Sequence, residues 1–289
     1  LPEKFLLIGM MSRAWSTRHG VTLPQDYNAK QETHAVRNAN GTGPYRVVRY
    51  EPDNRLVLAT HEGWWGPRRD VEEATWLVIQ SDATRLAALA SGEVDLLLDP
   101  PFQDVARLKR EGRFRVLETS DIGTQYLGFD QWRPEPEFSD LKGRNPFKDL
   151  RVRRAIAHAI DVDAIVAKVL RGQAAATGSH VSKLVDGYVP ALEQRLPHDP
   201  AAARALLREA GYADGFGVTL DCVNIAWRAA VCQAIAGMLA QVGIRVTFQP
   251  SASPQFFPKL TQATTSFFEV GWTPATDAWP LLNALVRSF

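Results

Sequence analysis

Alternating strand-like and helix-like segments in the second half of the chain constrain the fold more than any other feature. β-rich runs occupy residues 218–223, 244–248 and 266–272, and residues with helical periodicity lie between them. A helix between two strands of one sheet normally makes a right-handed crossover between parallel strands. The chain of 289 residues has room for two domains, and its second half is predicted to be α/β with a largely parallel sheet.

A pair of capped helices is predicted at residues 145–170, just before this alternation. Asp149 can cap the first helix and Asp161 the second, and Gly172 can end the second. The predicted buried face of the first helix comprises Val152, Ile156, Ala159 and Ile160. The other faces carry Arg151, Arg153 and Arg154. Charged helix faces are usually solvated, so this pair is interpreted as scaffold.

The first half of the chain is predicted to contain a hairpin, short helices and further strands. A helix is expected to begin at Ser81 or Asp82 and to end at Gly92. With strand-like runs at 74–80 and 94–98, this helix would form a βαβ-like unit. The other predicted strands are 45–50, 55–59, 115–118 and 125–129.

Composition and charge exclude several classes of protein. Lys and Arg total 33 and Asp and Glu total 32, so the net charge of +1 favours neither nucleic acid nor an anionic membrane. No run of about 18 apolar residues occurs, so no membrane-spanning helix is predicted. Cys222 and Cys232 are compatible with two buried thiols or with one disulfide. A helix-like pattern that continues to Phe289 predicts an internal fragment of a longer protein.

The sequence carries no motif that assigns a reaction. A G-x-S-x-G nucleophile elbow and Gly-rich phosphate loops are absent, and the six histidines are scattered without local zinc-ligand spacing. No catalytic residue, metal ligand or cofactor is therefore predicted. An α/β enzyme with an unrecognised active site stays open, because catalytic groups are often far apart in sequence.

Trp272 is the aromatic residue whose context favours a binding site. It ends a predicted strand, and ligands of open α/β sheets gather at the carboxyl ends of strands. With Asp277 nearby, it could present an apolar wall and an anion to a cleft. Alternatively, Trp272 belongs to the core and Asp277 caps the next helix.

Several segments together resemble the extracytoplasmic solute-binding proteins of ABC importers, in the peptide/nickel class (dipeptide- and oligopeptide-binding, family 5). The strongest match is NPFKDLRVRRAIAHAIDVDAIV at 145–166. The other matches, in order, are GTGPYRV (41–47), GWWGPRRDVEEATWLVI (63–79), RLAALASGEVDLL (85–97), YLGFD (126–130), DPAAARALLREAGY (199–212), Gly243-Ile244 and Gly271-Trp272.

The resemblance implies an α/β protein with two lobes, of the class II periplasmic-binding-protein type, truncated at both ends. Residues 1–128 would belong to the first lobe and 129–289 to the second, with the boundary in the Pro- and charge-rich region 129–147. It further implies a monomeric, periplasmic or lipid-anchored protein. Such a protein captures a peptide-like solute between its lobes and delivers it to a membrane permease, without nucleic acid. An extracytoplasmic sensor or chaperone is the alternative on the same fold.

The resemblance also suggests ligand-binding residues. Trp272 matches the cleft tryptophan of the family, but Ala275 stands where peptide-binding relatives carry an aspartate for the peptide amine. The nearest carboxylate is that of Asp277. Arg228 is the candidate partner for a solute carboxylate. The expected site residues are Trp272, Thr273, Asp277, Arg228, Tyr126 and Gln125. The identity of the solute is not predicted.

Overall fold

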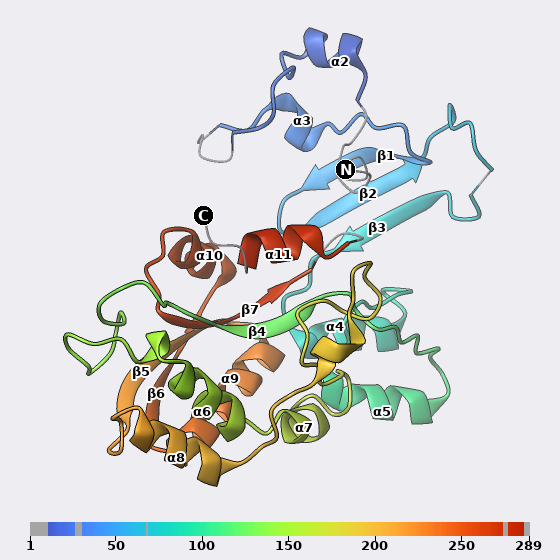
Figure 1. Cartoon of the computed structure of the whole chain (residues 1–289). Coiled ribbons are helices and arrows are strands. Elements are labelled where there is room, and N and C mark those ends of the chain that lie inside the picture. The colour runs from blue at the N-terminus through green and yellow to red at the C-terminus, as the bar shows by residue number, and fades with distance from the viewer. Residues whose placement is uncertain (1–10, 27–30, 68, 274–276, 286–289) are drawn as a thin grey trace. The chain divides into compact units, whose positions relative to one another are not determined.

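The computed structural model describes residues 11–26, 31–67, 69–273 and 277–285. The chain divides between Pro100 and Pro101 into two compact units (Figure 1). The predicted lobe boundary at 129–147 lies inside the second unit. The division into lobes 1–128 and 129–289 stays a prediction about the whole protein.

The first unit contains a three-stranded antiparallel sheet in the order β1-β2-β3. The predicted hairpin is confirmed. α4 begins where Ser81 Oγ accepts a hydrogen bond from Thr84 N and ends at Gly92, whose φ of 82° is left-handed. The elements are α2 (Arg13–Arg18), α3 (His34–Arg37), β1 (Tyr45–Glu51), β2 (Arg55–Thr60), β3 (Glu73–Leu77) and α4 (Asp82–Ser91).

Two predicted strands are wrong. Within the part of the chain that the structure describes, residues 94–98 and 115–118 pair with no strand, so the βαβ-like unit does not form. Leu96 and Leu98 are exposed. A short apolar run indicates burial, but a strand also needs a neighbour to complete its hydrogen-bonded ladder, and no pattern within the run reveals that neighbour.

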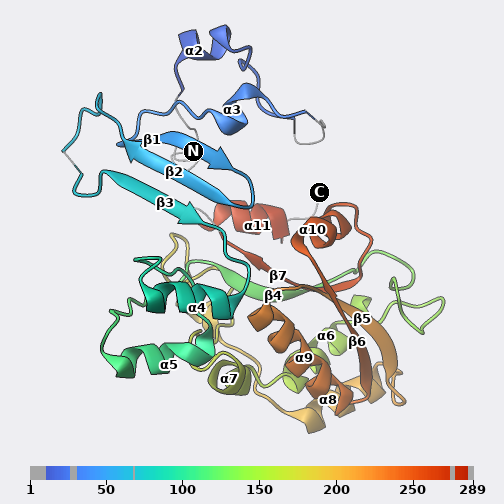
Figure 2. The ribbon, with the colours of Figure 1, turned by 180° about the vertical axis from the view of Figure 1, so that it is seen from behind.

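The second unit confirms the predicted α/β architecture. Its sheet has the order β4-β7-β5-β6, in which β5 is parallel to β6 and β7 while β4 is antiparallel to β7. α6 and α9 lie on one face of the sheet, and α10 and α11 lie on the other (Figures 1 and 2). The elements are α5 (Phe102–Glu111), β4 (Thr124–Phe129), η1 (Pro146–Lys148), α6 (Leu150–Ala159), α7 (Val162–Ala164), η2 (Ile165–Val169), η3 (Pro190–Glu193), α8 (Pro200–Glu209), β5 (Phe216–Val223), α9 (Ala226–Ala240), β6 (Ile244–Ser251), α10 (Ser253–Thr261), β7 (Phe267–Trp272) and α11 (Trp279–Leu285).

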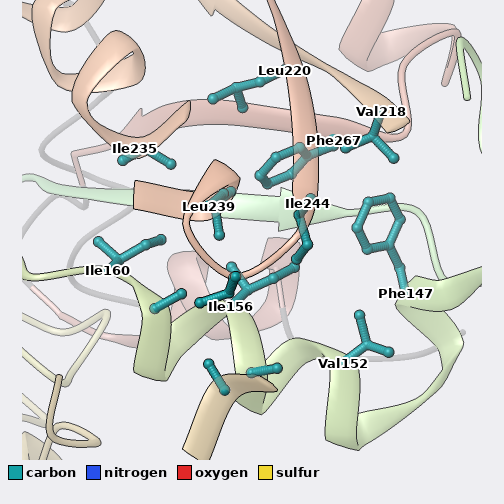
Figure 3. Close-up of a cluster of buried hydrophobic side chains, with 14 of the residues drawn as sticks. Phe147, Val152, Ile156, Ile160, Val218, Leu220, Ile235, Leu239, Ile244 and Phe267 are labelled. Carbon is teal, nitrogen blue, oxygen red and sulfur yellow. The ribbon is translucent and has the colours of Figure 1, made fainter. Parts of the chain in front are cut away.

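The main core lies between α6, α9 and the sheet. Figure 3 shows Ile156 of α6 and Leu239 of α9 gathered against Ile244 of β6. All four residues of the predicted buried face of α6 are buried, from Val152 to Ile160. The prediction of the capped helix pair is therefore confirmed.

Two arginines of α6 take part in local scaffolding, which agrees with their interpretation. Arg151 forms an ion pair with Asp149 and donates a hydrogen bond to the carbonyl of Glu209 at 2.8 Å. Arg153 donates to the carbonyl of Phe147 at 2.6 Å. These bonds fix the start of α6 against its neighbours.

Two glycines allow the parallel strands β5 and β6 to start side by side. Gly215 and Gly243 both have left-handed φ, 69° and 97°. A Cβ on Gly215 would overlap the carbonyl oxygen of Gly243, which accepts a hydrogen bond from Phe216 N at 3.3 Å. Only glycine fits this approach without strain.

A disulfide joins Cys222 at the end of β5 to Cys232 in α9, and both residues are fully buried. Of the two possibilities that the sequence left open, the structure therefore contains the disulfide. No helix among the described residues has the length and apolar character needed to span a bilayer.

Candidate functional site

The pairing of β4 with β7 brings predicted site residues from distant parts of the chain to one end of the sheet. Thr124 lies opposite Trp272, Gln125 opposite Gly271, and Tyr126 opposite Val270. Trp272 is the last residue of β7, so this end is the carboxyl end of a strand, as predicted.

These residues occupy two faces, because side chains alternate along a strand. Tyr126 packs with Val270 and Phe268 on the face covered by α10. Trp272 shares that face, since it lies two residues beyond Val270. Gln125 lies on the opposite face, where its side chain runs over Gly271 and occupies the space that a Cβ there would need.

A loop absent from the predicted site completes the face of Trp272. Trp272 packs against a buried cluster made by Val181, Val185, Ala278 and Leu281. The ring of His180 lies beside that of Tyr126, with centroids 5.1 Å apart. Burial lowers the pKa of His180, and burial, followed by the negative charge of Glu269, raises the pKa of Tyr126. The segment around His180 is rich in Gly, Ser and Pro, so its sequence carries no periodic signal that could have placed it.

Arg228 is buried rather than solvated. It lies in the first turn of α9, and its Nε donates a hydrogen bond to Glu269 Oε2 in β7 at 2.9 Å. The two side chains are 9% and 4% exposed. Within the described residues, Arg228 Nη2 and Glu269 Oε1 are buried without a hydrogen-bond partner. Burial raises the pKa of Glu269, and the bond from Arg228 opposes this rise.

Glu269 is the residue of this pair that sequence reasoning missed. A carboxylate inside an apolar strand, FFEVGW, was the available signal, because a charge in a core strand requires a partner.

Asp277 and Thr273 follow β7 and differ in their surroundings. Asp277 Oδ1 accepts a hydrogen bond from Trp279 N at 2.7 Å, so it caps α11, as one of the two alternatives predicted. Thr273 is exposed, and its Oγ1 lies beside Gly123 at the start of β4. Ala275, at the position of the expected aspartate, lies outside the described residues.

One group of three potential metal ligands lies close together among the described residues: Cys222, Cys232 and Glu269. The two sulfurs are bonded to each other. Only the carboxylate of Glu269 is therefore left in this group as a potential metal ligand. Its hydrogen-bond partner is the cationic side chain of Arg228.

This arrangement can bind a solute through aromatic and polar groups. Tyr126 and Trp272 supply large apolar surfaces with polar atoms at their edges. Gln125 is exposed and carries both a donor and an acceptor. The two aromatic side chains on one face, and the amide of Gln125 at the same end of the other face, offer apolar contact and hydrogen bonds to a small molecule at this end of the sheet.

Comparison with known proteins assigns the chain to a family. Residues 6–288 match the bacterial extracellular solute-binding proteins, family 5. The chain therefore belongs to that family, a family of binding proteins, and the predicted resemblance is confirmed.

Relatives and a solved structure agree with this assignment. The heme-binding protein A of Haemophilus influenzae is 30% identical over 176 residues, which make up 61% of this chain and 30% of the relative. The dipeptide-binding protein of Escherichia coli is 27% identical over 183 residues, 63% of this chain and 32% of the relative. The periplasmic binding protein DppA of Helicobacter pylori, in complex with the peptide STSA, superimposes with a TM-score of 0.77 at 22% identity, over 94% of this chain and 50% of DppA. The predicted fold class is thus confirmed, and the chain spans a third to a half of the length of these proteins.

Proposed function

We propose that the protein is the solute-binding component of an ABC import system and captures a peptide or peptide-like solute in a cleft between lobes. Membership of the solute-binding family supports the class of function. Relatives named for dipeptides and for heme support a solute with both apolar and polar parts.

The observation that carries the proposal is the pairing of β4 with β7. It places Tyr126 and Trp272 on one face at the carboxyl end of β7, with His180 beside Tyr126. An aromatic wall at the end of a strand can hold an apolar side chain or a peptide plane, and its neighbours can orient the solute through hydrogen bonds.

The remaining site residues have distinct proposed roles. Gln125 and Thr273 are exposed and would form hydrogen bonds with the solute backbone. Arg228 is buried and already binds Glu269, so it would act on a solute carboxylate through the charge beneath the site rather than by direct contact. Asp277 would contribute negative charge near the solute while it caps α11.

Delivery to permease subunits in the membrane, a periplasmic or lipid-anchored location and a monomeric state complete the proposal. These follow from the family's role in import. Hinge closure between two lobes would then present the loaded form to the permease.

Calorimetric titration of the chain with a set of dipeptides and tripeptides tests the proposal. At least one peptide is expected to bind, and Trp272→Ala is expected to lower its affinity at least tenfold, which is about 1.4 kcal/mol. Trp132→Ala is the matched control, because Trp132 is an exposed tryptophan beyond the opposite end of β4. Absence of binding by every peptide, or equal losses in both variants, would contradict the proposal.

A further inference from the structure

The first turn of α9 lacks the usual means of holding a helix start. Among the described residues, no side chain caps it: Ile225 occupies the N-cap position, and the first turn contains no acidic residue. The first four N–H groups of a helix have no partner within the helix, so an uncapped start tends to fray. Something else must hold this turn, because it carries the buried Arg228.

Two contacts tie the first two turns of α9 to the sheet. The disulfide joins Cys232 of α9 to Cys222 of β5, and Arg228 binds Glu269 of β7. Arg228 and Cys232 are four residues apart, so they share one face of the helix. A carboxylate oxygen of Glu269 lies within 4.8 Å of both sulfurs. The disulfide and the ion pair therefore belong to one buried cluster.

The ion pair is incomplete by itself. A guanidinium and a carboxylate can form two parallel hydrogen bonds, but here only Nε to Oε2 is made. Nη2 and Oε1 are buried, with no partner in the described part of the chain. A pair left free to optimise its geometry would use both bonds, so the position of Arg228 is set by the helix that carries it rather than by the pair.

We propose that the Cys222–Cys232 disulfide is a redox-sensitive strut, which positions Arg228 on Glu269 and thereby sets the solute affinity of the sheet end at Tyr126 and Trp272. This inference rests on the proposed function. Arg228 and the two cysteines act as positioning residues.

The reduction step is a thiol–disulfide exchange with a dithiol reductant. A thiolate of the reductant attacks one sulfur, the Cys222–Cys232 bond breaks, and the mixed disulfide is resolved by the second thiol. Two electrons and two protons pass to the cysteines, and the reductant becomes a disulfide. Both sulfurs are fully buried, so attack requires the uncapped turn to open.

Reduction changes the geometry because bonded and non-bonded sulfurs need different separations. Sulfurs in a disulfide are about 2.05 Å apart. Heavy atoms that are not bonded approach to only about 3.5–4.0 Å. The sulfurs must therefore separate, and in the proposed strut the first turns of α9, which no described side chain caps, take up part of this separation and carry Arg228 with them.

Loss of Arg228 alters the charge beneath the candidate site. Glu269 faces Arg228 of α9 on one side of the sheet, and the disulfide beside it does not titrate. Tyr126 of β4 lies on the other side, where burial, followed by the negative charge of Glu269, raises its pKa. Glu269 lies three residues before Trp272 and one residue before Val270, which packs with Tyr126. A buried carboxylate without its cation takes up a proton or rearranges, and either change reaches these residues.

Hydrogen exchange read by mass spectrometry tests the strut without any solute. In the chain reduced by dithiothreitol, amides of residues 226–231 are expected to exchange at least tenfold faster than in the oxidised chain, while those of residues 233–240 and β6 change little. The double variant Cys222→Ala/Cys232→Val, which keeps the site apolar, is expected to behave as the reduced chain does. Equal exchange rates in the oxidised and reduced chains, or a uniform increase of the exchange rates over the whole second unit, overturn the proposal.

Titration with a peptide that binds the oxidised chain tests the coupling. Reduction is expected to lower its affinity at least fivefold in the wild type, and Arg228→Met is expected to make the affinity independent of the redox state. A merely structural disulfide would weaken both proteins equally, and that result overturns the coupling. If no peptide binds the oxidised chain, the proposed function fails, whereas the exchange experiment still decides whether the strut exists.

Discussion

Arg228 and Glu269 form a buried ion pair through a single hydrogen bond, from Nε to Oε2 at 2.9 Å. The pair connects the first turn of α9 with β7, directly under the candidate site. Its energetics can be tested by removing the cation alone or both charges together.

Arg228→Met is expected to lower the free energy of unfolding by roughly 3–5 kcal/mol at neutral pH, because it leaves a buried charge without a partner. The pKa of Glu269 is already raised above 4.5 in the folded chain. Its titration therefore contributes stability that is present below about pH 4.5 and is lost as the pH rises through the folded pKa. Without Arg228 this pKa rises further, so the deficit of the variant should be smallest in acid and should grow with pH.

Denaturant unfolding between pH 4 and pH 8 measures this effect. The double variant Arg228→Met/Glu269→Leu is the control, and it should recover most of the lost stability because it buries no charge. A deficit of Arg228→Met that stays constant with pH would contradict the assignment of the effect to Glu269.

Gly271→Ala is expected to push the side chain of Gln125 from its place over β7. The added Cβ would overlap the amide of Gln125. Overpacking of this kind costs roughly 1–3 kcal/mol, and the flexible amide should keep the loss near the lower end. Gln125→Ala in the same chain should restore most of the stability, because it removes the obstructing atoms. Urea unfolding of the two single variants and the double variant measures this coupling, and additive losses would disprove the contact.

Gly215→Ala should be more damaging than Gly211→Ala, although both glycines have left-handed φ, 69° and 83°. Left-handed backbone costs a non-glycine residue roughly 1–2 kcal/mol. A Cβ at Gly211 meets no atom of the described residues within 4 Å, whereas one at Gly215 meets the backbone of Gly243. The extra overlap adds roughly 1–3 kcal/mol. Thermal unfolding of both variants separates steric overlap from backbone strain, and equal losses would show that β5 and β6 can separate freely.

Asp130→Asn is expected to weaken the connection between the end of β4 and the segment before η1. The carboxylate accepts hydrogen bonds from Arg133 Nη1 and Ser266 Oγ, both at 2.9 Å. Burial acts to raise the pKa of Asp130, but the bonds from Arg133 and Ser266 outweigh it, so the pKa is lowered. The variant should lose roughly 1.5–3 kcal/mol at neutral pH, as is typical of bonds to a charged group.

The stability that Asp130 contributes is present above its unfolded pKa of about 3.8 and is lost as the pH falls through the lower folded value. The difference between wild type and variant should therefore shrink in acid. Glu135→Gln is the control, since Glu135 also accepts a backbone hydrogen bond but its side chain is 40% exposed, against 3% for Asp130. A difference that persists unchanged at pH 2 would exclude the charge as its origin.

Local signals in the sequence predicted most of the second unit. Asp149 and Asp161 each lie at a helix start, and each accepts a hydrogen bond from the first turn, as predicted. These signals act within one helical turn, so they can be read from neighbouring residues. The strand predicted at residues 94–98 is wrong because a strand, unlike a helix cap, depends on a partner strand elsewhere in the chain.

The candidate site was only partly predictable for the same reason. Trp272, Tyr126 and Gln125 were named from their motifs, and the register of β4 on β7 brings them together. The approach of His180 to Tyr126 arises from a loop that follows η2 and has no periodic pattern. Glu269 stood out as a charge in an apolar strand, but its pairing with Arg228 depends on how α9 packs on β7, which no local pattern specifies.

The antiparallel pairing of β4 with β7 has a consequence for the order in which the protein is made. Thr124 leaves the ribosome long before its partner Trp272, and β5 and β6 are synthesised between them. Until β7 emerges, β4 has no neighbour in the sheet. The parallel pair β5–β6 can form first, and the end of the sheet with Tyr126 and Trp272 is assembled last. A nascent chain stalled before residue 267 would therefore hold a folded scaffold and no site.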